Sequence, residues 1–377
     1  MRFFIIGLAH TKTVDPINDP SFAGCAYTAK AWYLCRMLTE RGHEVYHVGN
    51  AGSNPVCTRQ LNVGNPEQWI ARYGGRRSTD FFDCSDNDYT ASFYNQARKM
   101  VQHNGGEAFS SIVCLPFGQS QRLAVEGLSQ LVVESGIGYG NAFTDFRVYE
   151  SYAWLHHDMG RLLGLWEGDV WNWAVIPSAK DVDVWGPVVP TAQKENYFMC
   201  VCRMNADKGI GDACAAARTL GIPIKIVGQG NPEPFLAPGV EYIPPVAQKD
   251  LVPLLCKARA LFSYSHYPEP FGNIAVEAGL CGCPVITTDW GVYPETVVQY
   301  KTGFRCRSPE QLLAAAQSVD TIDPFVCRAW TEANYGLERV GCMYEEYFFH
   351  ISRGVRERKT VDLGWLNTDY STLEVRA

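Results

Sequence analysis

Short apolar runs and helical spacing alternate along the first fifty residues. The run RFFIIGL at 2–8 is continuously apolar, as expected for a parallel strand that is buried on both faces. Residues 25–41 then place apolar side chains three and four positions apart, and Gly42 follows where a left-handed helix terminator belongs. The segment HEVYHVG at 43–49 is apolar again. This order of strand, helix and strand predicts a doubly wound α/β unit.

The alternation is less regular between residue 50 and the middle of the chain. Residues 50–90 are rich in Gly, Asn and Arg with interleaved aromatics, which predicts a loop-rich insertion. An apolar strand at 110–118, a helix near 120–132 and a strand at 131–138 then continue the pattern. We therefore expect residues 1–187 to form one Rossmann-like domain.

A second alternation follows the Pro-rich segment 185–196. It predicts strands at 197–203, 222–230, 259–265 and 283–289, and helices at 211–221, 249–258 and 273–282. These elements indicate a second Rossmann-like domain at 188–348, followed by a C-terminal segment, 349–377, that we expect to cross back to the first domain. Ligands of such sheets bind outside the carboxyl ends of the strands, so the two domains should face a common cleft.

Composition fits a soluble, cytoplasmic chain of two domains. It has 377 residues, of which 46% are hydrophobic and 19% charged. No run approaches the roughly 20 apolar residues of a membrane span, and the apolar N-terminus is too short for a signal peptide. The 14 cysteines are scattered, many in apolar runs, which indicates reduced thiols. The C-x-C pairs, Cys200/Cys202 and Cys281/Cys283, lack the spacing usual in zinc sites and are interpreted as core residues.

The net charge of −7 and the pI of about 5.7 argue against general nucleic-acid binding. The basic run RGVRERK at 353–359 is interpreted as a solvated helix end or tail. The acidic triplets DND at 86–88 and DVD at 181–183 resemble metal-binding D-x-D motifs. We interpret both triplets as cap or loop residues and predict no metal site.

The segment EPFGNIAVE at 269–277 places two carboxylates around a turn and a helix start. The helix should begin near Asn273, with Asn273 and Glu277 on one face. Gly272 leaves the first backbone N–H groups accessible, and a helix N-terminus suits a phosphate. A carboxylate accepts hydrogen bonds from vicinal hydroxyls, so Glu277 and Glu269 could each face a sugar with phosphates between them. This predicts a nucleotide-sugar site; the alternative is a pair of solvated carboxylates.

Neighbouring loops supply residues that suit a diphosphate. Arg203 and Lys208 follow the first strand of the second domain, and two cations at the carboxyl end of a strand suit a diphosphate leaving group. Gly228 and Gly230 make a sharp turn at the end of the next strand, where backbone can approach a ligand closely. An exposed basic pair is the alternative for the two cations.

These segments resemble a known family. Residues 197–230 and 267–297 are similar to the donor domain of retaining GT-B glycosyltransferases of glycosyltransferase family four, and residues 23–45 resemble its opening helix and strand. The resemblance implies a GT-B fold, with Glu277 on the ribose and Glu269 on the transferred sugar. The donor-binding residues would be Arg203, Lys208, Gly228, Gly230, Glu269, Phe271, Gly272, Asn273, Ile274 and Glu277.

The acceptor side departs from that family. A histidine usually follows a strand of its N-terminal domain, whereas the corresponding LVVESGIGYG here offers Glu134. His10, after the first strand, also points toward the expected cleft. The catalytic candidates are therefore Glu269, Arg203, Lys208, Glu134 and His10. His156 and Tyr139 are acceptor-side candidates; for His156 and its neighbour His157, packing on a helix at 151–160 is the alternative.

The predicted reaction moves a sugar from a nucleotide-diphosphate sugar, expected to be a UDP- or GDP-sugar, to a hydroxyl. The resemblance implies retention at the anomeric carbon, and no metal or other cofactor is expected. The acceptor stays open among a glycan, a lipid, a protein and a modified nucleic-acid base. Contacts that select the donor base are expected near residues 243–250. The alternatives are a nucleotide-sugar epimerase or hydrolase of the same architecture and a non-catalytic nucleotide-sugar-binding protein.

Overall fold

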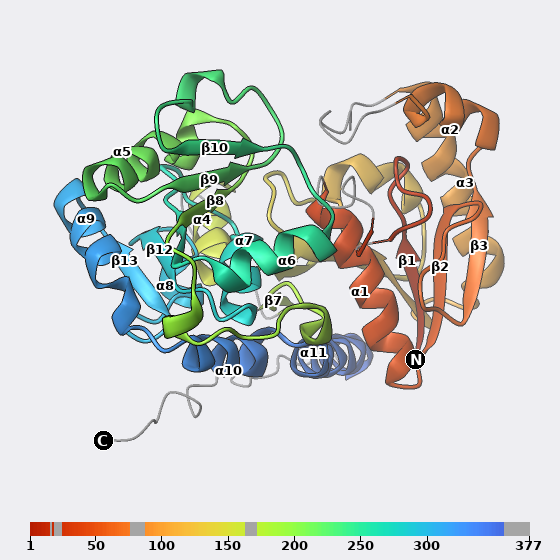
Figure 1. Cartoon of the computed structure of the whole chain (residues 1–377). Helices are drawn as coiled ribbons and strands as arrows, with labels where there is room; N and C mark the ends of the chain where they lie inside the picture. Colours follow the sequence, from red (N-terminus) through yellow and green to blue (C-terminus); the bar gives the residue numbers. More distant parts are fainter. Residues whose placement is uncertain (16, 19–24, 76–86, 163–171, 358–377) are drawn as a thin grey trace.

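Two parallel sheets, each flanked by helices, make up the chain in the computed structural model (Figure 1). The structure describes residues 1–15, 17–18, 25–75, 87–162 and 172–357. The first sheet has the order β3-β2-β1-β4-β5-β6-β7 and the second has the order β10-β9-β8-β11-β12-β13. Every strand pair in both sheets is parallel. The predicted α/β fold class is confirmed.

The strands are short and mostly apolar. Those of the first sheet are β1 (Arg2–Ile6), β2 (Glu44–Asn50), β3 (Arg59–Val63), β4 (Ser111–Leu115), β5 (Leu131–Ile137), β6 (Phe146–Tyr149) and β7 (Trp173–Val175). Those of the second are β8 (Phe198–Val201), β9 (Ile224–Val227), β10 (Val240–Ile243), β11 (Ala260–Ser263), β12 (Val285–Thr288) and β13 (Gly303–Cys306).

The α-helices fill most of the connections between strands. They are α1 (Ala26–Glu40), α2 (Pro66–Tyr73), α3 (Asp88–Asn104), α4 (Tyr152–Leu162), α5 (Ile210–Leu220), α6 (Gln248–Lys257), α7 (Asn273–Leu280), α8 (Tyr293–Thr296), α9 (Pro309–Ser318), α10 (Pro324–Tyr335) and α11 (Leu337–Glu357). In the described ranges, every helix is too short or too polar to cross a membrane.

Alternation along each strand divides the core between the two faces of its sheet. In β1, Phe3 packs in a cluster with residues of α1 and α11, whereas Phe4 packs in a cluster with residues of α3. In β8, Met199 and Phe198 likewise belong to different clusters. Successive side chains of a strand point to opposite faces, so each sheet needs helices on both sides.

α11, the last helix of the described residues, packs against the first sheet (Figure 1). It begins at Leu337, inside the range 188–348 expected for the second domain, so the crossing starts before the segment 349–377 for which it was expected. Tyr347 and Phe348 are fully buried with the β1 side chains, and the Phe348 and Phe3 ring centroids are 4.8 Å apart. Arg41, the C-cap residue of α1, forms ion pairs of 3.0 and 2.9 Å with Glu338 and Glu345. Part of the C-terminal segment, residues 358–377, lies outside the described residues.

Two predictions about the first domain are wrong. Residues 50–90 contain the strand β3 and the helix α2 in addition to loops. Asn65 caps α2 by accepting hydrogen bonds from two N–H groups of the first turn, and a proline occupies the first helical position. The helix expected near 120–132 is a 3-10 helix, Gly118–Ala124, and Gly127 follows with a φ of 72°. That left-handed glycine ends the segment before β5 begins. Residues 76–86 of the same stretch lie outside the described part.

Candidate active site between the two sheets

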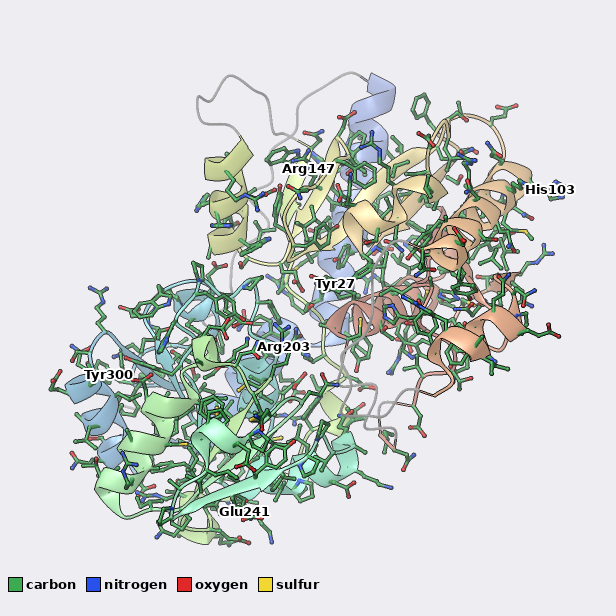
Figure 2. All side chains as sticks on the ribbon, turned by 90° about the horizontal axis from the view of Figure 1, so that it is seen from above. Tyr27, His103, Arg147, Arg203, Glu241 and Tyr300 are labelled. Atoms are coloured by element: carbon green, nitrogen blue, oxygen red, sulfur yellow. The ribbon has the colours of Figure 1, made fainter. Side chains whose placement is uncertain are left out.

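A cavity of about 260 Å³ lies between the N-terminus of α1 and the strand ends of the second sheet. Cys25, Ala26 and Ala29 line it from the first domain, and Arg203, Gly228 and other residues considered below line it from the second. Figure 2 shows Tyr27 and Arg203 toward the middle of the molecule, where the two domains meet. The cleft expected from the sequence is therefore present, with loops of both domains around it.

The N-terminus of α7 opens into this cavity. Gly272 is the N-cap residue with φ 69° and ψ 53°, and no side chain caps the helix. Asn273 and Ile274, the first two helical residues, line the cavity. Uncapped N–H groups and the positive end of the helix dipole make this position suitable for an anion.

Glu277 lies on the same face of α7 as Asn273, as the spacing predicts, and one lysine binds both. Lys180 Nζ is 2.6 Å from Glu277 Oε1 and 2.7 Å from Asn273 Oδ1. Lys180 is 5% exposed and comes from the connection between the two sheets. All three side chains line the cavity. Glu277 is thus held by a buried cation and is not a solvated carboxylate.

Glu269 is paired with the second predicted cation. Lys208 Nζ lies 2.8 Å from Glu269 Oε2 and 3.2 Å from Oε1, and the two side chains are only 13% and 15% exposed. Ser265 Oγ donates a 2.9 Å hydrogen bond to Oε2, and Lys208 also donates to the hydroxyl of Tyr267. Each carboxylate of the EPFGNIAVE segment therefore has its own lysine.

Arg203 lines the cavity, whereas Lys208 and Glu269 are not among its lining residues. Its exposed side chain lines the cavity, and no hydrogen bond or ion pair engages its guanidinium within the described ranges. Burial and the charge of Glu269 raise the pKa of Tyr267, whereas Arg203 lowers it. Arg203 is therefore within electrostatic reach of Tyr267 and keeps its donors available for an anion.

In the turn after β9, the close approach of the Cys202 backbone leaves no room for a side chain at Gly228. Gly228 has a φ of 147°, and a Cβ atom added there would lie 1.8 Å from the Cys202 carbonyl oxygen. Gly230 also has a positive φ, 111°, and is exposed. The absence of a side chain lets the strand ends of β8 and β9 approach each other beside Arg203.

Residues expected to select the donor base also reach the cavity. Pro245, Val246 and Gln248 line it. The start of α6 contacts the first domain, because Lys249 N donates a 3.1 Å hydrogen bond to the Ile17 carbonyl. This part of the cavity is apolar on one side and polar at Gln248, which suits a flat base with a few polar edges.

Phe271 does not line this cavity. Its side chain is 2% exposed and packs in the core of the second domain, 5.8 Å from Tyr335 between ring centroids. Only its backbone can contribute to a donor site.

The interpretation of Glu134 as a catalytic candidate finds no support. Its carboxylate is 0% exposed and accepts hydrogen bonds from the N–H groups of Phe143 and Thr144, from the Thr144 hydroxyl and from the Tyr139 hydroxyl. Burial raises its pKa although these bonds oppose the shift. Glu134 and Tyr139 together fix the loop after β5, so the carboxylate has no open access to an acceptor.

The candidate histidines are in different environments. His10 is buried beside the cavity, with its Nε2 3.3 Å from the Sγ of Cys25 and its ring 6.0 Å from Phe117 between centroids. His156 and His157 are exposed on α4, where they contact the rings of Tyr152 and Trp154. Only His10 of these three contacts a cavity-lining residue.

In the D-x-D triplet at 181–183, Asp181 is the N-cap residue of a short 3-10 helix, Val182–Val184, as the interpretation of a cap predicts. Asp181 accepts from the Asp183 N–H and forms a 2.6 Å ion pair with Arg36 of α1. In the other triplet Asn87 caps α3, and residue 86 lies outside the described part. No cluster of three possible metal ligands occurs in the described ranges. Of the C-x-C cysteines, Cys202 alone is not buried: it lines the cavity.

The sequence interpretation missed Lys180, Tyr267 and Ser265. Lys180 lies 97 positions from Glu277 in the chain, so no local spacing connects them. Ser265 and Tyr267 immediately precede the EPFG turn, and a search for hydroxyls beside Glu269 would have found them. The contacts of this site are thus partly local and partly dependent on the packing of the two domains.

Comparison with known proteins finds similarity in the second domain. Residues 183–322 match the family described as glycosyl transferases group 1. A glycogen synthase of Mycobacterium tuberculosis (strain CDC 1551 / Oshkosh) is 27% identical over 194 residues, which are 47% of this chain and 41% of that protein. The match thus spans about two fifths of the length of the curated relatives. Residues 183–322 are thus similar to glycosyl transferases group 1.

Solved structures identify the fold of the whole chain. Sucrose-phosphate synthase from Thermosynechococcus elongatus is similar with a TM-score of 0.67 at 15% identity, covering 95% of this chain and 100% of that one. Anabaena HepE in complex with UDP-glucose is similar with a TM-score of 0.61 at 13% identity, covering 93% and 99%. The chain has the GT-B fold, with two Rossmann-like units.

Proposed function

We propose that this protein transfers a sugar from a nucleotide-diphosphate sugar to a hydroxyl acceptor, with retention of anomeric configuration and without a metal. The observation that carries the proposal is that Arg203, the uncapped start of α7 and Glu277 line one interdomain cavity. A cation, a helix N-terminus and a diol-binding carboxylate are the groups that a nucleoside diphosphate requires.

The donor occupies the cavity with its base near Pro245, Val246 and Gln248 and its ribose on Glu277. Its diphosphate lies between Arg203 and the N-terminus of α7. The transferred sugar extends toward Glu269, where Lys208 neutralises the carboxylate in the absence of donor. The UDP-glucose bound by the structural relative HepE supports a UDP-sugar as the first donor to test.

Charge that develops on the departing diphosphate is stabilised by Arg203, Lys208 and the backbone N–H groups of α7. Two fixed cations and a helix N-terminus supply positive charge where a divalent metal would otherwise do so. His10, beside Cys25 at the cavity wall, is the acceptor-side group that we assign to orienting the incoming hydroxyl.

The first experiment measures melting temperatures with UDP, GDP, ADP and their common sugar conjugates, for wild type and for Glu277→Ala. A ligand at 100 times its Kd adds about 2.7 kcal/mol to the stability of the folded state. We expect one nucleotide series to stabilise wild type and to stabilise Glu277→Ala much less. No shift with any nucleotide would contradict the proposal.

The second experiment follows sugar transfer from the donor so identified, with and without a strong chelator, using glycan, lipid and protein acceptors. Full activity in chelator is the expected result, and the anomeric configuration of the product, read by proton NMR, should equal that of the donor. Free or epimerised sugar without an acceptor would instead indicate a hydrolase or an epimerase.

A further inference from the structure

Lys180 lies where the two connections between the domains meet. It belongs to the segment after β7, and its N–H donates a 2.8 Å hydrogen bond to the carbonyl of Tyr335, at the end of α10. Lys180 and Gly336 form an isolated parallel bridge just before α11 begins. Its backbone is therefore fixed by both interdomain crossings.

The side chain of Lys180 binds residues of the second domain. Its ammonium group donates to Glu277 Oε1 and to Asn273 Oδ1 at 2.6 and 2.7 Å, and the lysine side chain is 7% exposed. Removing a buried cation from water is costly, and only a close carboxylate with additional hydrogen bonds offsets that cost. The ion pair and the amide contact provide both.

Lys30 and Glu150 form another buried ion pair, whose charges are paired without Lys180. Lys30 Nζ lies 2.7 Å from Glu150 Oε2, and Glu150 Oε1 accepts from the Ser178 hydroxyl. Burial lowers the pKa of Lys30, and the charge of Lys180 acts in the same direction. Lys180 is thus matched to Glu277 and not to Glu150.

Among the described residues, the ion pair with Lys180 leaves one carboxylate oxygen of Glu277 free to bind a ligand. Oε1 is occupied by Lys180, and within the described ranges no protein group donates to Oε2. The carboxylate lines the cavity with one oxygen free to accept a hydrogen bond. A freely rotating carboxylate would lose conformational freedom on binding, whereas this one is already fixed.

We propose that Lys180 is a positioning residue that orients Glu277 toward the ribose hydroxyls of the donor and so determines selectivity for ribonucleotides. This inference rests on the proposed function, because it assumes a nucleoside diphosphate in the cavity. Lys180 itself does not contact the reacting atoms. Its location ties the geometry of the ribose site to the relative placement of the two domains.

The test compares Kd for a nucleoside diphosphate with Kd for its 2′-deoxy counterpart, using whichever of UDP, GDP and ADP binds wild type most tightly. A hydrogen bond to a charged group corresponds to a discrimination of about 10- to 100-fold, which we expect for wild type. Lys180→Met should reduce the ratio to about 3 or less. Lys180→Arg, which keeps the charge, should retain more discrimination than Lys180→Met.

Lys208→Met is the matched control, because Lys208 holds the other carboxylate, Glu269. It should weaken both ligands equally and leave the ratio unchanged. Should Lys180→Met not fold, Lys180→Gln takes its place, with the same expected loss of discrimination.

The outcomes separate this inference from the proposed function. If wild type binds none of the three nucleotides, the proposed function is contradicted. If wild type discriminates and the folded Lys180 variants discriminate equally well, the proposed function stands and the role of Lys180 is overturned. Wild type that binds both forms with equal Kd would also overturn it, because Glu277 would then not contact the 2′-hydroxyl.

Discussion

The ammonium group of Lys208 lies 2.8 Å from the carboxylate of Glu269 in the donor-free protein, and both side chains are largely buried. The carboxylate proposed to bind the transferred sugar is therefore neutralised by the cation proposed to bind the diphosphate. Donor binding would draw Lys208 toward the phosphates and release Glu269 oxygens for sugar hydroxyls. In such an exchange Lys208 would neutralise phosphate charge in place of the carboxylate, and Glu269 would accept hydrogen bonds from the sugar hydroxyls instead.

Replacing Lys208 should lower turnover strongly. Loss of one preorganised group that stabilises developing charge costs about 100- to 1,000-fold in rate, and we expect this range for the kcat of Lys208→Ala. Steady-state transfer assays at saturating donor measure the effect. Lys301→Ala, which changes an exposed lysine away from the cavity, is the control and should match wild type. Near-normal turnover of Lys208→Ala would remove this lysine from the mechanism.

Replacing Arg203 should have an effect of similar size. Its guanidinium lines the cavity and is available for a phosphate, so Arg203→Ala should lose about 100- to 1,000-fold in kcat/KM. Arg218→Ala, an exposed arginine on α5, is the matched control. Equal kinetics of the Arg203 and Arg218 variants would show that the diphosphate lies elsewhere.

Gly228→Ala should destabilise the second domain. The new Cβ would lie 1.8 Å from the Cys202 carbonyl oxygen at a φ of 147°. Backbone strain of this kind costs about 1–3 kcal/mol before the steric clash is added. Gly211→Ala on α5 meets no atom within 4 Å and should stabilise by about 0.5–1 kcal/mol. Urea unfolding of the two variants should therefore shift in opposite directions, and a common shift would contradict this account.

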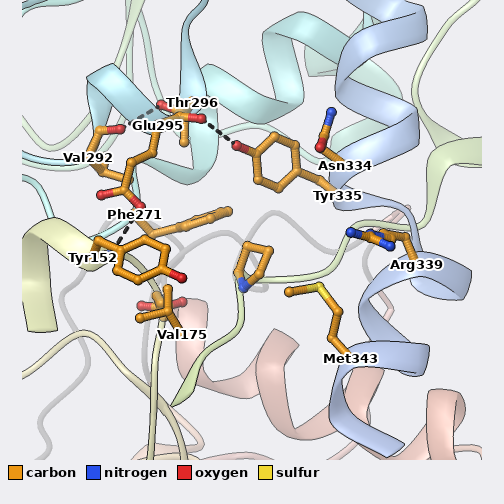
Figure 3. A pocket seen from close by; sticks show the side chains of 12 residues that line it. Tyr152, Val175, Phe271, Val292, Glu295, Thr296, Asn334, Tyr335, Arg339 and Met343 are labelled. Atoms are coloured by element: carbon orange, nitrogen blue, oxygen red, sulfur yellow. Dashed lines mark hydrogen bonds between the residues drawn. The ribbon is translucent and has the colours of Figure 1, made fainter. Parts of the chain in front are cut away.

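Glu295 connects the domains on the side of the EPFG turn. Its carboxylate accepts hydrogen bonds of 2.9 and 2.8 Å from the N–H groups of Tyr152 and Ala153, the first residues of α4. Figure 3 shows Glu295 beside Tyr152. Glu295 and Tyr152 line a small cavity of about 50 Å³. Loss of a helix cap costs about 0.5–2 kcal/mol.

For Glu295→Ala we therefore expect amide hydrogen exchange at Tyr152 and Ala153 to accelerate by about 2- to 30-fold. Glu310→Ala, which removes a carboxylate from the first turn of α9 in the same domain, is the control. Unchanged exchange at the start of α4 in Glu295→Ala would mean that this contact does not hold the helix.

His47 should make stability depend on pH. Burial lowers its pKa from 6.5 to about 4, while Nδ1 lies 2.7 Å from Gln60 Oε1. The folded state keeps the ring neutral and the unfolded state protonates below pH 6.5, so stability is lost as pH falls from about 6.5 to 4. The loss amounts to about 2–3 kcal/mol. Urea unfolding should show a smaller loss between pH 7 and pH 4.5 for His47→Gln; parallel curves would contradict the assignment.

The apolar pattern predicts the strands well because a parallel sheet buries both faces of each strand. Asn273 and Glu277 are also predictable as one face of a helix, since local spacing decides that relationship. Lys180 is not predictable in this way, because its pairing with Glu277 depends on how the two domains pack. Glu134 became a candidate only because it occupies the stretch where the resembling family has a histidine, and that correspondence could not predict that loop N–H groups bind its carboxylate.

The return of α11 to the first sheet has a consequence for synthesis on the ribosome. The core around β1 includes Tyr344, Tyr347, Phe348 and Ile351, so that core stays unfinished until residue 351 has been translated. The second sheet ends at Cys306, and α10 completes its core by residue 335. Domains usually fold in the order of their synthesis. Here the second domain can finish folding first, and the first domain needs α11 before it can do so.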